Sequence, residues 1–169
     1  AELLDGQIDK NTKLRRFKAG EAEKERIGMD LTFNAPKSVS LQALVYGDAK
    51  IIAAHDAAVK ATLMEAETLA KARRTEKKQV HIEETGNIVA ATFRHETNRE
   101  QEPHLHTQAV LMNMTRREDG EWRALMNDSI VKNTEYLSNV YNRSLARELE
   151  NQGFQIRYGE NGAFDLAHI

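Results

Sequence analysis

The chain of 169 residues contains no cysteine. Disulfide bridges, thiolate metal sites and cysteine nucleophiles are therefore excluded, and this absence fits a cytoplasmic protein. No apolar run approaches the roughly 18 residues that span a bilayer, and no signal peptide is visible. The chain also lacks an excess of charge, because 24 basic residues stand against 26 acidic ones. A net charge of −2 argues against general binding of polyanions, so any contact with nucleic acid must be local.

The composition is that of one globular domain. Hydrophobic residues make up 40% of the chain and charged residues 30%, which is the balance of a soluble protein. A chain of 169 residues is long enough to bury a core. We see no internal repeat and no low-complexity tract, and we therefore expect a single domain over residues 1–169.

Helical patterns occupy the first half of the chain. Residues 1–28 are rich in Lys, Arg and Glu without a sustained apolar period, which indicates a short helix followed by a mobile loop. A short helix capped by a serine is expected at 38–46. Asp48 then caps a long helix that reaches about Arg73, and its apolar stripe, typical of a helix on a sheet, is interrupted only by His55 and Thr62.

A second amphipathic helix is expected at 134–152. Its apolar residues, Tyr141 among them, fall on one face, and Gly153 provides a C-terminal stop. Tyr141 is accordingly predicted to lie in the core.

Strand patterns begin at 29–33, where apolar and polar residues alternate until Pro36. After a basic turn at 71–78, further strands are expected at 79–84, 87–94, 104–115 and 121–125. The segments 84–87 and 119–120 supply hairpin turns.

Strands that succeed one another across short polar turns predict an antiparallel meander. A last small hairpin is expected to pair 154–158 with 163–166 across Asn161 and Gly162. The predicted fold class is therefore α+β, an antiparallel β-sheet with helices packed on one face and the other face left for ligand.

A row of metal-ligand residue types lies on one of these strands. Successive side chains of a strand alternate faces, so His104, His106 and Gln108 would project from one face about 6–7 Å apart. His95 lies at the end of the apolar run 87–93. If this run pairs antiparallel with the next strand, His95 comes to lie beside the row and three nitrogens can converge.

A structural interpretation of the row also has to be considered. A His-x-His pair on a strand is often half-buried or faces solvent without any ligand. A third histidine across a hairpin argues for the metal site. The flanking Arg94, Asn98 and Arg99 are suited to phosphate, although Arg and Asn on a loop are also ordinary solvated residues.

Two separated motifs connect the chain to a known family. The segment Asp30-Leu-Thr-Phe-Asn-Ala-Pro-Lys-Ser-Val-Ser40 precedes His95-Glu-Thr-Asn-Arg-Glu-Gln-Glu-Pro-His-Leu-His-Thr-Gln108, and 120–123 and 139–141 follow. From about Met29 onward the chain resembles the MobF-type relaxase domains of conjugative plasmid transfer proteins. The resemblance implies a palm-like fold shared with Rep nucleases, a divalent cation held by three histidines, and a tyrosine that attacks DNA and leaves a 5′-phosphotyrosine.

The resemblance carries over to the site residues with one departure. The first two family histidines fall on His95 and His106, but the third falls on Gln108. In one interpretation the amide oxygen of Gln108 completes a harder site, which suits Mg²⁺ or Mn²⁺. In the other, the row shifts by one strand repeat and His104 coordinates with His106. We favour Gln108, because the motif aligns without a gap and a slip would change the whole row.

The resemblance also concerns an acidic residue and a tyrosine. Asp30 falls on the family's acidic residue beside the site, where a carboxylate could fix an imidazole tautomer or help deprotonate a tyrosine. The structural alternative is that Asp30 satisfies a backbone group at a strand end. Family members carry their catalytic tyrosines upstream of this motif, and no tyrosine precedes Asp30 here. We therefore expect a single relaxase domain fragment that lacks the N-terminal tyrosine segment.

The implied function is nicking of single-stranded DNA at a transfer origin by tyrosine transesterification. Expected DNA-binding residues are Lys37, Arg94, Asn98, Arg99, Arg116 and Arg123. Relaxosome accessory proteins and a secretion coupling protein are further expected partners, without membrane insertion. Two other functions stay open, a phosphodiesterase that uses metal-activated water and a catalytically weak module that binds single-stranded DNA.

Overall fold

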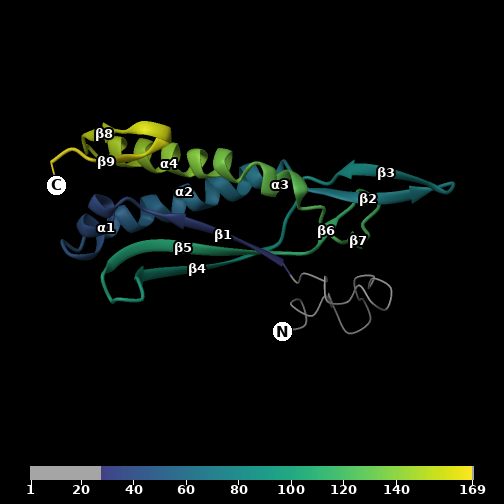
Figure 1. Ribbon diagram of the computed structural model, residues 1–169, viewed down its shortest axis with the longest axis horizontal. Coiled ribbons are helices and arrows are strands. Elements are labelled where there is room, and N and C mark those ends of the chain that lie inside the picture. Colours follow the sequence, from purple (N-terminus) through teal and green to yellow (C-terminus); the bar gives the residue numbers. More distant parts are fainter. Residues whose placement is uncertain (1–27, 169) are drawn as a thin grey trace. The chain divides into compact units, whose positions relative to one another are not determined.

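The computed structural model describes residues 28–168, so the predicted helix and loop before Gly28 lie outside the described residues. Figure 1 shows the elements along the chain. They are β1 (Gly28–Asn34), α1 (Lys37–Leu44), α2 (Ala49–Glu67), β2 (Lys71–Glu76), β3 (Gln79–Glu84), β4 (Ala90–Thr97), β5 (Pro103–Met112), β6 (Thr115–Arg116), β7 (Trp122–Arg123), α3 (Asp128–Lys132), α4 (Thr134–Asn151), β8 (Ile156–Tyr158), the 3₁₀ helix η2 (Glu160–Gly162) and β9 (Phe164–Leu166).

The described chain falls into two compact units. Unit 1 contains residues 28–31, 66–91 and 110–133, and unit 2 contains residues 32–65, 92–109 and 134–168. Three strands form one sheet in the order β1-β5-β4, and each of these strands has residues in both units. None of the described helices is both long and apolar enough to pass through a bilayer.

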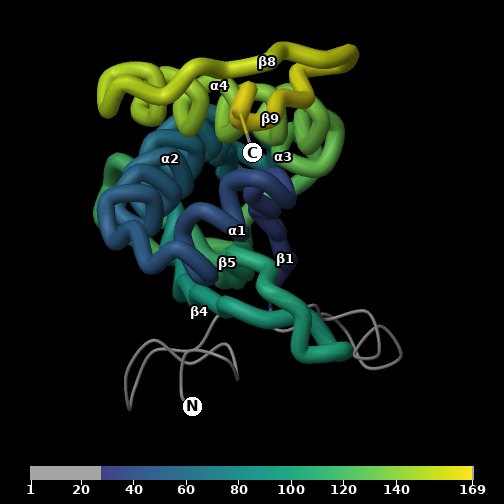
Figure 2. The backbone as a smooth tube through the Cα atoms, turned by 90° about the vertical axis from the view of Figure 1, so that its left-hand side faces the viewer, coloured from purple at the N-terminus to yellow at the C-terminus, as the bar shows by residue number. Residues whose placement is uncertain are grey.

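Besides β8, η2, β9 and residues 32–34 of β1, unit 2 contains the helices α1 and α4, most of α2, and the unit 2 residues of the strands β4 and β5. In Figures 1 and 2 these helices lie on one side of the two strands. The buried side chains of β5 alternate, as Leu105, Thr107 and Ala109 are buried while the residues between them are half-buried. This alternation places one face of β5 toward the helices and the other face away from them. The predicted fold class, α+β with helices on one face of antiparallel strands, is confirmed.

A buried hydrogen-bond chain links three elements of unit 2. The His55 side chain on α2 is fully buried, with Nδ1 2.7 Å from the Tyr141 hydroxyl on α4 and Nε2 2.7 Å from Thr107 Oγ1 on β5. Tyr141 lies in the core as predicted and is 2% exposed. The polar interruption of the α2 stripe is therefore a satisfied core group, as burial of a polar group requires.

The serine cap predicted for the first helix is wrong, because α1 begins at Lys37 after Pro36 and has no side-chain cap. Ser38 has a different role. Its hydroxyl donates to Asp165 Oδ1 at 2.6 Å and accepts the Leu166 N–H at 2.9 Å. The predicted C-terminal hairpin is confirmed as β8 and β9, and the serine ties α1 to it.

The cap of the second helix is confirmed, since Asp48 Oδ1 accepts the Lys50 N–H at 3.1 Å. Its predicted end near residue 73 is wrong. The helix ends at Glu67, where tighter bonds such as Leu69 N–H to the Ala66 carbonyl close the last turn.

The basic turn predicted at 71–78 is wrong as well. Residues 71–76 form β2, which pairs antiparallel with β3 in unit 1. Lys77 and Lys78 connect the two strands with φ angles of 49° and 64°. Two successive left-handed residues suit a tight hairpin turn, although the turn usually contains Gly or Asn.

The order of the remaining strands also departs from a meander. β3 pairs with β2, whereas β4 pairs with β5, so the segment 84–87 is not a hairpin turn. Instead, the Thr85 N–H donates to the Ala70 carbonyl at 3.0 Å, and the Asn87 side chain donates to the Arg116 carbonyl at 2.8 Å. These bonds hold the segment within unit 1. The turn predicted at 119–120 is confirmed between β6 and β7.

Candidate metal and DNA site

The face of β5 that points away from the helices carries the predicted ligand row. His104, His106 and Gln108 are half-buried there, between the fully buried side chains of the opposite face. His95 lies on the neighbouring strand β4 and is exposed. In unit 2 the His95 and His104 rings each lie against the His106 ring.

The histidine rings are stacked against one another. The ring centroids of His95 and His106 are 5.1 Å apart, and those of His104 and His106 are 4.4 Å apart, with interplanar angles of 26° and 23°. Two imidazoles that share one ion through N–metal bonds of about 2.1 Å have centroids about 5 Å apart. The distance between the His95 and His106 ring centroids is therefore in the range of two imidazoles that share one ion.

A backbone contact orients the central imidazole. His106 Nδ1 lies 2.9 Å from the His104 carbonyl oxygen. Because a carbonyl can only accept, Nδ1 carries the hydrogen, and Nε2 of the neutral ring keeps its lone pair. A bond from the second ring nitrogen to a backbone carbonyl is the usual support of a metal-ligating histidine.

The identity of a third ligand depends on Gln108 and His104. Burial, followed by the charge of His106, lowers the pKa of His104 below its ordinary value of 6.5, which favours the neutral ring that a metal needs. Residues 28–168 contain no arrangement of three His, Cys, Asp or Glu side chains that could hold an ion. A site with His95 and His106 would therefore need a third donor of another type, and the amide oxygen of Gln108 is such a donor.

Asp30 lies on β1 within unit 1 and is exposed. Its neighbours Leu31 and Phe33 are buried, so strand alternation puts the carboxylate on the face away from the core. The carboxylate is therefore accessible to a ligand or to solvent.

The polar residues predicted to bind DNA have different environments in unit 2. Lys37 begins α1 and is exposed, as is Arg99. Arg94 forms an ion pair with Asp56 on α2, with Nη1 2.5 Å from Oδ2. The Asn98 side chain accepts the Glu100 and Glu102 N–H groups at 2.9 Å and thereby shapes the loop between β4 and β5. Lys37 and Arg99 are thus the more available of the four.

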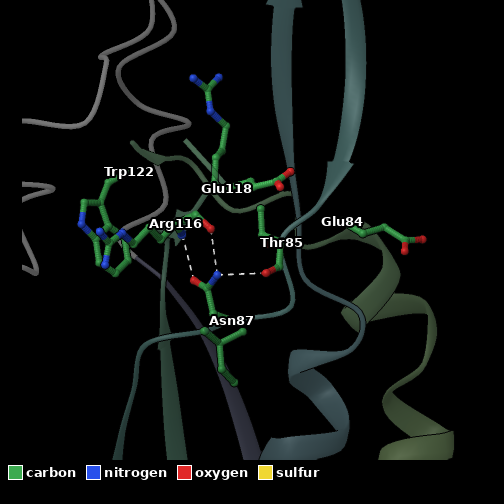
Figure 3. Close-up of a pocket in the computed structure, with 8 residues that line it drawn as sticks. Glu84, Thr85, Asn87, Arg116, Glu118 and Trp122 are labelled. Atoms are coloured by element: carbon green, nitrogen blue, oxygen red, sulfur yellow. Dashed lines mark hydrogen bonds between the residues drawn. The ribbon is translucent and has the colours of Figure 1, made fainter. Parts of the chain in front are cut away.

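The remaining two predicted DNA contacts, Arg116 and Arg123, lie in unit 1, where Arg116 lines a pocket of about 600 Å³ (Figure 3). The pocket is lined by Glu84, Thr85, Asn87, Ile88, Arg116, Arg117, Glu118 and Trp122. The Asn87 side chain donates to the Arg116 carbonyl and accepts the Arg116 N–H, both at 2.8 Å, and so joins two of the segments that line the pocket. Arg116 is paired across the strands with Trp122. Arg123 Nη1 donates to the Trp122 carbonyl at 2.8 Å.

Some functional candidates were missed by sequence reasoning. Thr107 lies between His106 and Gln108 and bonds His55 on the helix-facing side. The polar interruption of the α2 stripe at His55 was the available signal. The sequence gives no such signal for the pocket that Trp122 and Arg116 line, because its residues come from separated segments.

Comparison with known proteins identifies the family of the chain. The profile of the TrwC relaxase family matches residues 1–169. The multifunctional conjugation protein TraI of Escherichia coli strain K12 is 42% identical over 144 residues, which cover 85% of this chain and 8% of TraI.

Two solved structures of the conjugative relaxase TrwC in complex with OriT DNA are also similar. The metal-free complex has a TM-score of 0.95 and 59% identity, covering 99% of this chain and 60% of that one. The metal-bound complex has a TM-score of 0.94 and 59% identity, covering 99% and 58%. The chain thus spans about 60% of the length of these structures and a small part of TraI. The chain belongs to the TrwC relaxase family.

Proposed function

We propose that this chain holds the metal and the DNA in a relaxase that nicks one strand at a transfer origin and leaves a 5′-phosphotyrosine link. The supporting observation is the pair of imidazoles, His95 and His106, 5.1 Å apart on the strand face that points away from the helices. The family relationship adds the substrate, since TrwC relatives are complexed with OriT DNA. It also adds the metal, since one of these complexes is metal-bound.

His95, His106 and Gln108 are the proposed ligands. Two imidazoles and one amide oxygen form a donor set that suits Mg²⁺ or Mn²⁺. His104 is the alternative third ligand, but its ring stacks on His106, and within the described residues the imidazoles of His95, His104 and His106 are not arranged to hold one ion together. These residues would hold a cation whose positive charge would stabilise the negative charge that develops on the scissile phosphate in the transition state. The His106 Nδ1 bond keeps that ring aimed before DNA arrives.

Asp30 is proposed as the acidic partner of the reaction. Its exposed carboxylate can accept the proton of the attacking tyrosine. Attack forms a bond between the tyrosine oxygen and phosphorus and breaks the bond from phosphorus to the 3′ oxygen. The 3′ oxygen leaves and takes up a proton. One phosphate ester replaces another, so the strand can be rejoined by the reverse step.

The nucleophile is proposed to come from outside this chain. Tyr141 is buried against His55, and the hydroxyls of Tyr136 and Tyr158 donate to Glu65 and Glu150. These bonds raise the pKa of Tyr136 and Tyr158 and disfavour the nucleophilic phenolate. Tyr46 is exposed, but does not match a family tyrosine position.

The DNA is proposed to reach the site as a single strand. Exposed Lys37 and Arg99 would contact phosphates beside the metal ligands. Arg94 and Asn98 lie on the same β4–β5 hairpin as Arg99 and are further proposed DNA contacts. Arg116 and Arg123 are the proposed DNA contacts of unit 1. Relaxosome accessory proteins and a coupling protein are proposed partners in the bacterial cytoplasm.

An adduct assay tests the proposal. Residues 1–169 are joined to a tyrosine-bearing N-terminal segment of a family member and incubated with single-stranded OriT DNA and Mn²⁺. We expect a protein–DNA adduct that survives denaturation, that disappears in His106→Ala, and that persists in His81→Ala, which changes an exposed histidine of unit 1. Cut DNA without an adduct would instead indicate hydrolysis by water. DNA binding without cutting would indicate a binding module, and either result would contradict tyrosine transfer.

A further inference from the structure

An exposed aromatic ring lies beside the proposed metal ligands. Phe93 on β4 is 52% exposed. It is two residues from His95, so strand alternation puts both side chains on one face, about 6–7 Å apart. Stacking of His95 on His106 identifies this face as the one that carries the ligand row. An apolar ring and the metal ligands therefore share the same strand face.

The pairing of the two strands locates Phe93 more closely. β4 and β5 are neighbours joined by the short segment 98–102, and the Met112 N–H donates to the Val89 carbonyl at 2.7 Å. With His95 against His106, an antiparallel register puts Phe93 opposite Gln108. Side chains opposite each other have Cβ atoms about 5 Å apart. Phe93 is thus the immediate neighbour of the proposed third ligand.

The surroundings of Phe93 suit an aromatic partner. Its chain neighbours Thr92 and Arg94 project to the opposite face, where Arg94 is paired with Asp56. The face of Phe93 therefore carries imidazoles and an amide, with no charged side chain of β4 between Phe93 and His95. By contrast, the exposed aromatics Tyr136 and Tyr158 have their hydroxyls bonded to glutamates.

We propose that Phe93 is a stacking platform for the base of a nucleotide that adjoins the phosphate at the metal site. The inference rests on the proposed function, since it requires single-stranded DNA on this face. A base is joined to its phosphate through one sugar, and so it reaches a ring next to Gln108 when the phosphate is at the ligands. Stacking on an aromatic ring tolerates any base, because every base has a π-face. Phe93 therefore positions the strand, whereas sequence selection belongs to other residues.

The experiment measures DNA affinity with and without the base. Fluorescence anisotropy follows binding of labelled single-stranded OriT DNA to the wild-type chain and to Phe93→Ala. We expect Phe93→Ala to weaken binding about 5- to 100-fold, and Phe93→Trp to restore it. A series of strands with one abasic position each should contain one position at which wild type and Phe93→Ala bind equally. Equal affinity of both proteins for every intact strand would overturn the inference.

Controls separate this outcome from misfolding and from failure of the proposed function. Tyr158→Ala removes another exposed aromatic of unit 2 and should leave DNA affinity unchanged. Because Phe93 is exposed, Phe93→Ala should keep wild-type Mn²⁺ affinity and circular dichroism. A wild-type chain that binds no single-stranded DNA would overturn the proposed function and this inference together. A wild-type chain that binds, with Phe93→Ala equal to it, would overturn the inference alone.

Discussion

Strands β5 and β4 both carry proposed ligands, but their environments differ. β5 has Leu105, Thr107 and Ala109 buried in unit 2, and Thr107 is bonded to the His55 chain. On β4, residues 92–97 are exposed on both faces. The half of the site on β5 is therefore fixed by packing, whereas the half on β4 has few tertiary contacts and is freer to adjust. A set of ligands that is divided in this way can be preorganised on β5 and completed by β4 when DNA and metal bind.

Acid should weaken the buried contact between His55 and Thr107 of β5. Burial lowers the pKa of His55 from 6.5 to about 4. The unfolded chain takes up a proton below about pH 6.5, whereas the folded chain resists it until about pH 4. The contribution of His55 to the free energy of unfolding is thus complete above pH 6.5 and is lost as the pH falls toward 4. It amounts to about 3 kcal/mol at most, and urea unfolding between pH 7 and 4 measures it. His55→Gln should flatten this dependence, and an unchanged slope would contradict the assignment.

Removing one proposed ligand from each strand tests the comparison between β5 and β4 at the site. We expect His106→Ala to lower Mn²⁺ affinity about 30- to 100-fold, because it removes the ring that its backbone bond already orients. His95→Ala should cost less, because β4 is less constrained. Isothermal titration calorimetry measures both, with His81→Ala as the matched control. A larger loss for His95→Ala would reverse our assignment of the fixed half.

Thr107→Val should destabilise the protein by about 1–2 kcal/mol, because it leaves a buried nitrogen of His55 without its partner. Thr107→Ser, which keeps the hydroxyl, should recover most of this loss. Thr62→Val is the matched control, since Thr62 is equally buried but bonds only the Ala58 carbonyl of its own helix. We expect Thr62→Val to cost less in the free energy of unfolding measured with urea. Equal costs would show that the link to β5 adds nothing.

Arg94→Ala should have the smallest effect. The ion pair with Asp56 is solvent-exposed, at 41% and 49% for the two side chains, and such pairs contribute about 0.2–1 kcal/mol. Thermal unfolding should therefore change little, and less still in 1 M salt. A loss comparable to that of Thr107→Val would mean that β4 is anchored as firmly as β5.

The parts of the fold that sequence predicts are those set by local patterns. The strand at 29–33, the helix beginning at Thr134 and the turn at 119–120 follow from alternation, helical periodicity and an Asp-Gly pair. The pairing of β4 with β5 was expected as a hairpin, but the position of β1 beside β5 could not be predicted, because it depends on contacts between distant segments. β2 was missed for another reason. Its residues are mostly charged, and its Lys77-Lys78 turn lacks the Gly or Asn that marks hairpins.

The candidate site shows the same division. The histidine row follows from the period of two along β5, so His104, His106 and Gln108 were predictable as a group. The bond from His106 Nδ1 to the His104 carbonyl and the support from His55 behind Thr107 depend on side-chain packing. No sequence pattern specifies them.

The central claim is that His95 and His106 bind one cation together. Paramagnetic line broadening by Mn²⁺, followed on the imidazole signals of the wild-type chain by NMR, tests it most directly. We predict that the signals of both rings broaden in parallel at the same Mn²⁺ concentration, and that His106→Ala removes the broadening of His95 at that concentration. Broadening of one ring alone, or persistence of the His95 effect in His106→Ala, would contradict a shared ion.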